Sequence, residues 1–418
     1  MNRNRPGHDA APHSVQGGRP APGSDRSGHD ASAPHSVRGG RPAPDPGPLT
    51  AGSAEPLAVE PDEPNQPLAA VALGGGHGLH ATLSALRMLA DRGVAGPVTA
   101  VVTVADDGGS SGRLRRELGV LPPGDLRMAL AALAGEQLAT GTASADRAAT
   151  GDAPWIRLLQ HRFGGTGALA GHAVGNLLLA GLMEVLDDPV TALDEVGALV
   201  GARGRVLPMA CEPLDIEAEV TGLEDDDPHR AHRIRGQVAV ASTPGRVRRV
   251  RLLPERPQAC SPALAAVRSA DLLLLGPGSW FTSVLPHLLV PELRDALVSS
   301  AARKVIVLNL APEPGETAGF SPEQHLAVLA EHAPDLRVDA VLADTASVPV
   351  PDRLHRAAAA LLAPGGRVHL APIAAMDPTT PRHDPLALAD ALRGVLAGPD
   401  PARTAAGVPA GAGGRRPT

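Results

Sequence analysis

Six short apolar runs, each followed by a glycine-rich loop or a helical pattern, constrain the fold of this chain more than any other feature. Each run is apolar at nearly every position, which is typical of parallel strands buried on both faces. Helical patterns follow at 79–91, 283–300, 322–332 and 353–362. The alternation predicts an α/β fold, a doubly wound and mostly parallel sheet. The predicted strands are 68–74, 98–104, 271–276, 304–310, 338–344 and 367–373.

A long interval separates the second predicted strand from the third. Residues 125–200 have a mostly helical pattern, and 205–253 reads as extended strands, with 232–242 among them. We therefore expect an insertion at about 125–255, helical first and then built of antiparallel strands.

Residues 1–66 have a different composition from the rest of the chain. GHDAAPHSVQGGRPAP at 7–22 is nearly repeated at 28–44, and neither copy holds large apolar side chains. Such segments bury too little surface to offset their ordering entropy, so we expect a disordered tail. Alternative interpretations are a histidine metal tract, or sequence upstream of the true start. Residues 397–418 are expected to form a second disordered tail.

Glycines cluster where the first strand ends. Residues 74–81 read GGGHGLHA, and the next helix is predicted to begin directly after the glycines. Glycine lets a backbone approach a phosphate closely, and the free N–H groups of a helix start favour negative charge. A turn that needs positive backbone φ angles would also use glycine. This loop alone therefore does not distinguish a phosphate-binding loop from a tight turn.

The loop after the second strand carries the densest set of polar groups. Residues 105–113 read ADDGGSSGR. Carboxylates at this strand end are placed to accept hydrogen bonds from a ribose or to hold a metal ion, and GGSSG offers N–H groups and hydroxyls to an anion. Because Asp106 and Asp107 repel each other, one of them needs a partner such as Arg113, a cation or a ligand hydroxyl.

Polar residues recur at further strand ends and helix starts. Asp125 begins a helix, where a cap and a ligand contact are equally good interpretations. Asn176 lies in an apolar helix and needs a buried partner. The segment 276–283, GPGSWFTS, repeats the order of glycines and hydroxyls, with Trp280 and Phe281 placed to line an apolar wall. The candidate ligand-binding residues are Gly74, Gly75, Gly76, His77, Gly78, Asp106, Asp107, Gly108, Gly109, Ser110, Ser111, Arg113, Asp125, Asn176, Gly276, Gly278, Ser279 and Asn309.

Composition excludes several kinds of chemistry. Of the 38 basic residues only Lys304 is a lysine, so no lysine follows a glycine-rich loop as in a P-loop. Aromatic residues make up 1% of the chain and its net charge is −7, which argues against a nucleic-acid partner. Two cysteines, Cys211 and Cys260, cannot form a disulfide framework. Since no apolar run approaches the ~20 residues that span a membrane, we expect a cytoplasmic protein with no membrane partner.

Seven motifs, in order, resemble the gluconeogenesis factor family typified by YvcK, which belongs to the wider fold family of 2-phospho-L-lactate transferase (CofD). The resemblance covers roughly residues 68–396. The motifs are GGGHGL, VTVADDGGSSGRLR, PPGDLR, GHAVGNLLLAGL, GRVLPM, LLLLGPGSWFTSVLPHLLVPEL and NLAPEPGETAGFSPEQHL.

The resemblance implies a Rossmann-like domain over 67–396, a cytoplasmic location, and a UDP-sugar ligand, UDP-N-acetylglucosamine in particular. It further implies a role in cell shape and peptidoglycan precursor supply during gluconeogenic growth, with a protein partner in that synthesis, and it is compatible with a homodimer. By position it places the nucleotide-sugar contacts on 74–78, Asp106, Asp107, Ser110, Ser111, Arg113, Asn176 and 276–279.

Two positions depart from the family pattern. The usual first loop is GGGTG, and His77 replaces the threonine, which removes a hydroxyl from the predicted phosphate loop. The usual GE before the second extended pair is Gly236-Gln237 here, which removes a charge.

Three functions fit these features to different degrees. The leading hypothesis is a regulatory UDP-sugar-binding protein without turnover and without a required cofactor. The alternative is a CofD-like transferase that moves a phospholactyl group onto a deazaflavin alcohol, with magnesium held by Asp106 and Asp107. The third, an NAD(P)-dependent oxidoreductase suggested by G-x-G-x-x-A at 76–81, lacks a recognisable general acid–base pair.

Overall fold

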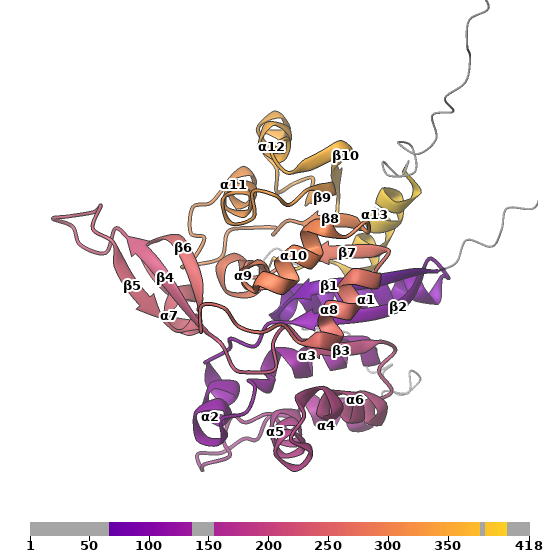
Figure 1. Cartoon of the computed structure of the whole chain (residues 1–418), viewed down its shortest axis with the longest axis vertical. Coiled ribbons are helices and arrows are strands. Elements are labelled where there is room, and N and C mark those ends of the chain that lie inside the picture. The colour runs from indigo at the N-terminus through magenta and orange to yellow at the C-terminus, as the bar shows by residue number, and fades with distance from the viewer. Residues whose placement is uncertain (1–66, 136–153, 377–380, 399–418) are drawn as a thin grey trace, which may run out of the picture. The chain divides into compact units, whose positions relative to one another are not determined.

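The computed structural model describes residues 67–135, 154–376 and 381–398 (Figure 1). The expected tail at 1–66, with its histidines, lies outside the described residues. Of the expected tail at 397–418 only Ala397 and Gly398 are described, and they end and cap the last helix.

A seven-stranded parallel sheet forms the centre of the fold and confirms the predicted α/β class. Its strand order is β10-β9-β8-β7-β1-β2-β3, and every neighbouring pair is parallel. The order reverses at β1, since β2 and β3 extend the sheet on one side and β7 to β10 on the other, which is the Rossmann-like arrangement. The strands are β1 (Leu68–Gly74), β2 (Ala95–Val102), β3 (Arg205–Pro208), β7 (Leu272–Leu275), β8 (Arg303–Val307), β9 (Val338–Asp344) and β10 (Leu362–Ala371).

Helices connect these strands and pack in separate groups. Helix α1 contacts α3 and α13, whereas α8 contacts α10, and Figure 1 shows α8 and α10 in front of the sheet. The helices are α1 (Gly76–Asp91), α2 (Gly109–Leu118), α3 (Pro123–Ala134), α4 (Pro154–Gln160), α5 (Val174–Leu186), α6 (Pro189–Val200), α7 (Gln237–Ala241), α8 (Ser261–Ser269), the π-helical turn η2 (Trp280–Val284), α9 (Pro286–Leu289), α10 (Pro291–Ser299), α11 (Pro322–His332), α12 (Pro351–Ala358) and α13 (Pro385–Ala397).

The predicted insertion at 125–255 contains helices followed by an antiparallel sheet, as expected, but one strand within its bounds belongs to the main sheet. Strand β3 lies inside that interval but pairs in parallel with β2, so the helices α2 to α6 belong to the crossover between two core strands. An apolar run in the sequence does not show which strand it will pair with. The pairing of β3 with β2 is known only from the fold. The separate antiparallel sheet is smaller, with the order β5-β4-β6. It comprises β4 (Asp215–Thr221), β5 (His232–Arg235) and β6 (Arg246–Leu253).

Two predicted elements end earlier than expected. The extended segment over 232–242 stops at Arg235, because Gly236 adopts a φ of 106° and the chain turns into α7. The helix predicted over 283–300 is interrupted, since Pro286 and Pro291 each begin a new helix. Proline has no N–H to continue a helix, so it is accepted at a first turn.

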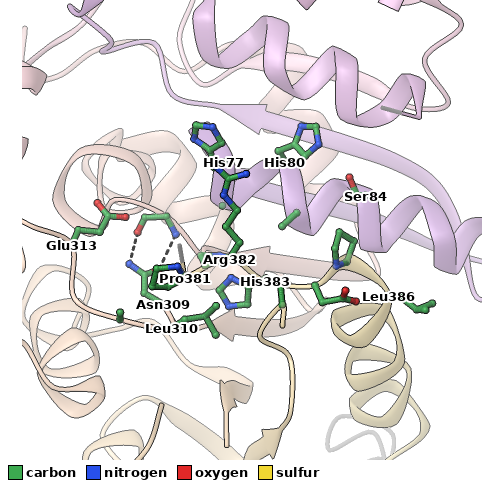
Figure 2. Close-up of a pocket in the computed structure, with 18 of the residues that line it drawn as sticks. His77, His80, Ser84, Asn309, Leu310, Glu313, Pro381, Arg382, His383 and Leu386 are labelled. Atoms are coloured by element: carbon green, nitrogen blue, oxygen red, sulfur yellow. Dashed lines mark hydrogen bonds between the residues drawn. The ribbon is translucent and has the colours of Figure 1, made fainter. Parts of the chain in front are cut away.

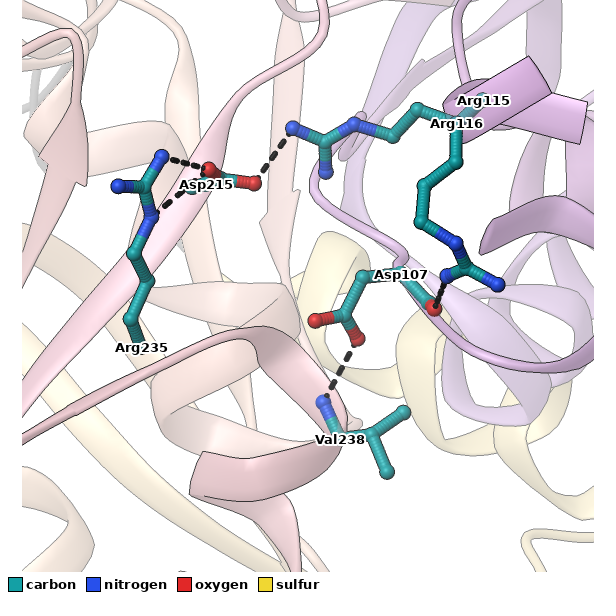
Figure 3. Close-up of polar contacts among 6 residues, drawn as sticks. All are labelled: Asp107, Arg115, Arg116, Asp215, Arg235 and Val238. Carbon is teal, nitrogen blue, oxygen red and sulfur yellow. Dashed lines mark hydrogen bonds and ion pairs between the residues drawn. The ribbon is translucent and has the colours of Figure 1, made fainter. Parts of the chain in front are cut away.

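Carboxylates join the antiparallel sheet to the loop and helix that follow β2 (Figure 3). Asp107 Oδ1 accepts a hydrogen bond of 2.9 Å from the N–H of Val238, at the start of α7. Asp215 accepts from Arg115 of α2 at 2.5 Å and from Arg235 of β5. Partial burial raises the pKa of Asp215, but the hydrogen bonds from Arg235 and Arg115 outweigh it, and the pKa falls below its ordinary value. The small sheet is thereby tied to the edge where the β2 loop lies.

The buried strands at the centre of the sheet predict a large cost for removing side-chain volume there. Leu274 of β7 is completely buried, so Leu274→Ala should lower the free energy of unfolding by about 2–5 kcal/mol in urea titrations. Leu169 is 54% exposed, and Leu169→Ala should cost about 1 kcal/mol or less. Equal losses at the two positions would contradict the placement of β7 in the core.

Candidate functional site

The glycine loops that follow β1 and β7 meet at the point where the strand order reverses. Helix α1 begins at Gly76, whose φ of 59° favours glycine. A Cβ atom on Gly78 would lie 2.1 Å from the carbonyl oxygen of Pro277, so only glycine lets the two loops approach this closely. In open parallel sheets, ligands bind in the crevice at such a reversal.

A cavity of about 540 Å³ opens beside these loops (Figure 2). Its volume lies within the roughly 300–1,000 Å³ typical of small-molecule sites. Four of the predicted residues line it: His77, Gly78, Gly278 and Asn309. The remaining lining comes from α1, the loops after β7 and β8, and the chain before and at the start of α13: His80, Ala81, Ser84, Met88, Pro277, Leu310, Ala311, Pro312, Glu313, Pro314, Ala375, Pro381, Arg382, His383, Asp384, Pro385 and Leu386.

The cavity has a cationic group beside the start of α1. Figure 2 shows the Arg382 side chain extending toward His77. Desolvation lowers the pKa of His77, and the charges of Arg382 and Arg127 lower it further. The pKa of His383 is lowered to about 4 by burial, and its Nε2 lies 3.2 Å from the carbonyl oxygen of Leu308. Both imidazoles are therefore neutral at pH 7, which leaves Arg382 as the positive charge of this wall.

The loop after β8 supports the loop after β7 and adds a carboxylate to the cavity. Asn309 Oδ1 accepts from the N–H of Gly278 and its Nδ2 donates to the carbonyl of the same residue, each at 2.9 Å. The predicted ligand residue Ser279 donates its hydroxyl to Glu313 at 2.6 Å. Desolvation raises the pKa of Glu313, and the Ser279 hydrogen bond opposes it. Asn309 thus positions the loop, while Glu313 presents the acidic group.

Two of the other predicted side chains, Ser110 and Asn176, lie in a buried polar cluster. Ser110 Oγ lies 2.9 Å from Nδ1 of His172 and accepts from Nδ2 of Asn176 at 3.0 Å. Arg127 donates from Nε to Oδ1 of Asn176 at 2.9 Å. The prediction that Asn176 needs a buried partner is confirmed, and the partners are protein groups.

Asp125 connects this cluster to the first glycine loop. Helix α3 is capped at Pro122, and Asp125 lies in its first turn, so the cap interpretation is wrong. Its carboxylate accepts from the N–H of Gly76, and a Cβ atom on Gly75 would lie 2.7 Å from its Oδ2. Desolvation and the charge of Asp106 raise the pKa of Asp125 to about 7. Asp125 therefore holds a carboxyl group with a pKa near neutral pH against the loop that borders the cavity.

The acidic pair and the arginine of the second loop are engaged by other parts of the protein. Asp106 Oδ1 accepts from the N–H of Gly108 at 2.9 Å, and Asp107 accepts from Val238 as described above. Arg113 donates to the carbonyl of Ala170 at 2.8 Å and to that of Ala168 at 3.4 Å. None of the three lines the cavity. The predicted site is therefore divided into a cavity wall and a supporting cluster.

The expectation that Trp280 and Phe281 line an apolar wall of the site is wrong. Both side chains are completely buried, and they pack edge to face against His325 and Phe320 respectively. The π-helical turn that holds them points them into the core, which sequence periodicity did not reveal.

Sequence reasoning missed the cavity residues contributed by the chain before α13. Arg382 and His383 lie in PRHDP, between two prolines, after the last strand and before a helix whose first turn is capped by Asp384. Charged residues between the end of a parallel strand and a helix start were the available signal. Glu313 was missed too, although it follows the predicted residue Asn309 by four positions.

Comparisons with known proteins agree on one family. The family described as 2-phospho-L-lactate transferase CofD matches residues 70–363. A Mycobacterium tuberculosis protein named "Putative gluconeogenesis factor" is 58% identical over 334 residues, which cover 78% of this chain and 90% of the relative. The "Gluconeogenesis factor" of Listeria monocytogenes is 36% identical over 279 residues, covering 67% of this chain and 78% of the relative.

A solved structure shares the fold. The crystal structure of a upf0052 family member from Bacillus halodurans is 32% identical and aligns with a TM-score of 0.62. The alignment covers 78% of this chain and 98% of that chain.

The raised pKa of Asp125 predicts a pH-dependent stability. A carboxyl whose folded pKa of about 7 exceeds its ordinary 3.8 binds its proton more tightly in the folded state, so stability falls as pH rises from about 4 through 7. Asp125→Asn removes this titration. Compared with the unaltered protein, the variant should gain roughly 2–3 kcal/mol between pH 5 and pH 8 in denaturant titrations.

The matched control for this prediction is Asp335→Asn, at an exposed aspartate. Its stability difference from the unaltered protein should be the same at pH 5 and pH 8. If Asp125→Asn behaves like this control, Asp125 does not titrate near neutral pH.

Proposed function

The chain belongs to the CofD family and, within it, to the gluconeogenesis factors, and we propose that it is a regulatory protein that binds a UDP-sugar, with UDP-N-acetylglucosamine as the first candidate. One observation carries the proposal: the cavity opens where the glycine loops after β1 and β7 meet, at the reversal of the strand order. That position in a Rossmann-like sheet suits a nucleotide diphosphate.

One side of the cavity suits phosphate oxygens. The first N–H groups of a helix have no partner within the helix. In α1 the N–H of Gly76 is bonded to Asp125, and the next two residues, His77 and Gly78, line the cavity. Arg382 adds a positively charged guanidinium group, which can donate two parallel hydrogen bonds to a phosphate. Lys304 is 7% exposed and donates from Nζ to the carbonyl of Ser300 at 2.5 Å, so the single lysine of the chain is engaged elsewhere.

Another part of the cavity suits hydroxyl or N–H groups. Glu313 is a half-buried carboxylate whose neighbour Ser279 already donates to it. A carboxylate repels phosphate but accepts hydrogen bonds from a sugar hydroxyl, an acetamido N–H or a base N–H. A ligand that carries both a diphosphate and a sugar meets both demands.

The transferase alternative receives less support. A deazaflavin would favour an aromatic wall, and Trp280 and Phe281 are buried in the core. Among the described residues no group of three or more His, Cys, Asp or Glu is arranged to hold a metal ion, and Asp106 and Asp107 both accept backbone N–H groups. Each of these two carboxylates therefore uses part of its acceptor capacity on the protein itself.

The wider role that we propose follows from the family. As a gluconeogenesis factor, the chain would act in the cytoplasm and link UDP-sugar levels to cell shape and peptidoglycan precursor supply through a protein partner, as a monomer or a homodimer. In the part of the chain that the structure describes, no helix has the length and apolarity to cross a bilayer.

Calorimetry at neutral pH tests the proposed ligand. UDP-N-acetylglucosamine should bind with one site per chain, and Arg382→Ala should weaken binding by about 10- to 100-fold, because a charged hydrogen bond contributes roughly 1.5–3 kcal/mol. Arg356, exposed on α12 and remote from the cavity lining, supplies the control Arg356→Ala, which should bind like the unaltered protein.

Two results would overturn the proposal. No heat with either UDP-N-acetylglucosamine or UDP-glucose would remove the UDP-sugar ligand. A magnesium-dependent product from a deazaflavin alcohol and an activated phospholactate would establish the transferase alternative instead.

A further inference from the structure

The fold brings the two cysteines of the chain into contact, although they are far apart in the sequence. Cys211 follows β3, and Cys260 precedes α8 as its N-cap. The N–H of Cys260 donates to the carbonyl of Met209 at 3.1 Å, which places the two segments side by side. The Cys211 thiol donates a hydrogen bond to the Cys260 sulfur. The pair belongs to neither the cavity nor its supporting cluster.

The two thiols differ in access to solvent. Cys211 is exposed and Cys260 is 1% exposed. Thiolates are stabilised at helix starts and beside arginines, and they are the nucleophilic form of cysteine. The pKa of Cys260 is lowered to about 7, first by the Cys211 hydrogen bond and then by the N–H of Ala263 and the charge of Arg205, against the effects of burial and of Asp188. The same hydrogen bond raises the pKa of Cys211, so near neutral pH the pair carries one thiolate and the two sulfurs share the remaining proton.

We propose that Cys211 and Cys260 are a site of reversible oxidation, forming a disulfide that joins the end of β3 to the start of α8. The oxidant is a peroxide. The proton between the two sulfurs passes to Cys260, and the thiolate that this leaves on the exposed Cys211 attacks a peroxide oxygen and expels hydroxide, which gives a sulfenic acid at Cys211 and, with one proton, water. The sulfur of Cys260 then displaces the hydroxyl group, and its S–S bond forms with release of a second water. Two thiols are oxidised and one hydrogen peroxide is reduced to two waters.

The position of the disulfide suggests what it would change. The segment that holds Cys211 runs beside the end of β2, because Met209 donates to the carbonyl of Val102 at 2.8 Å and Leu214 to that of Val104 at 3.2 Å. The same segment leads into β4 of the antiparallel sheet. A covalent link to α8 would restrict this segment and raise thermal stability, because a crosslink lowers the entropy of the unfolded chain. Pairs of this kind in reducing compartments are commonly transient and redox-sensing.

Alkylation and mass spectrometry of the full chain test the proposal. After exposure to hydrogen peroxide, both thiols should become unreactive to a maleimide, the intact mass should fall by two hydrogens, and digestion should yield one peptide pair joined through Cys211 and Cys260. Dithiothreitol should restore both thiols, and the oxidised protein should melt several degrees higher than the reduced one.

The single variants keep the outcome decisive. Cys260→Ser should leave Cys211 to accumulate sulfenic acid or to form intermolecular dimers, and Cys211→Ser should leave one buried thiol that reacts slowly. If the unaltered protein instead retains two alkylatable thiols, or yields only intermolecular dimers, or goes directly to sulfinic acid at Cys211, the proposal is wrong. None of these readouts depends on the UDP-sugar, so the two proposals fail separately.

Discussion

The close approach of the glycine loops after β1 and β7 is the constraint on which the site depends. Gly78 in the first turn of α1 lies against the backbone of Pro277, and this contact is possible because β1 and β7 are adjacent strands where the order reverses. A side chain at this point would push α1 away from the loop after β7. The cavity, the start of α1 and the chain before α13 could not then share one edge of the sheet.

Around this contact, the polar side chains divide into two kinds. Asn309 positions the loop after β7, and Asn176, Ser110 and Arg127 bond to one another in the interior. These hydrogen bonds are made to the protein, and they fix the geometry of the loops. The groups that line the cavity include backbone of the glycine loops and the side chains of Arg382 and Glu313. Preorganised loops of this kind lower the entropic cost of binding a small ligand.

The charge state of the site follows from burial rather than from residue type. His77 and His383 are neutral at pH 7 because desolvation and neighbouring arginines disfavour their cations. Asp125 holds its proton up to about pH 7. With one lysine in the chain, and that lysine bonded to a carbonyl, a phosphate in this cavity would be met by backbone N–H groups and a single arginine. The absence of tyrosine and the scarcity of lysine are therefore compatible with this site.

Sequence by itself determined the parallel α/β class, the extents of β1, β9 and α11, and the glycine loops at two strand ends, because continuous apolar runs and glycine clusters are local signals. The tertiary structure alone decided that β3 joins the main sheet and that Trp280 and Phe281 face the core. It also decided that Asp125 reaches the first loop, that Arg382 and Glu313 complete the cavity, and that Cys211 meets Cys260. Each of these facts joins residues distant in the chain, and a pattern read along one strand or helix carries no information about which distant backbone will lie beside it.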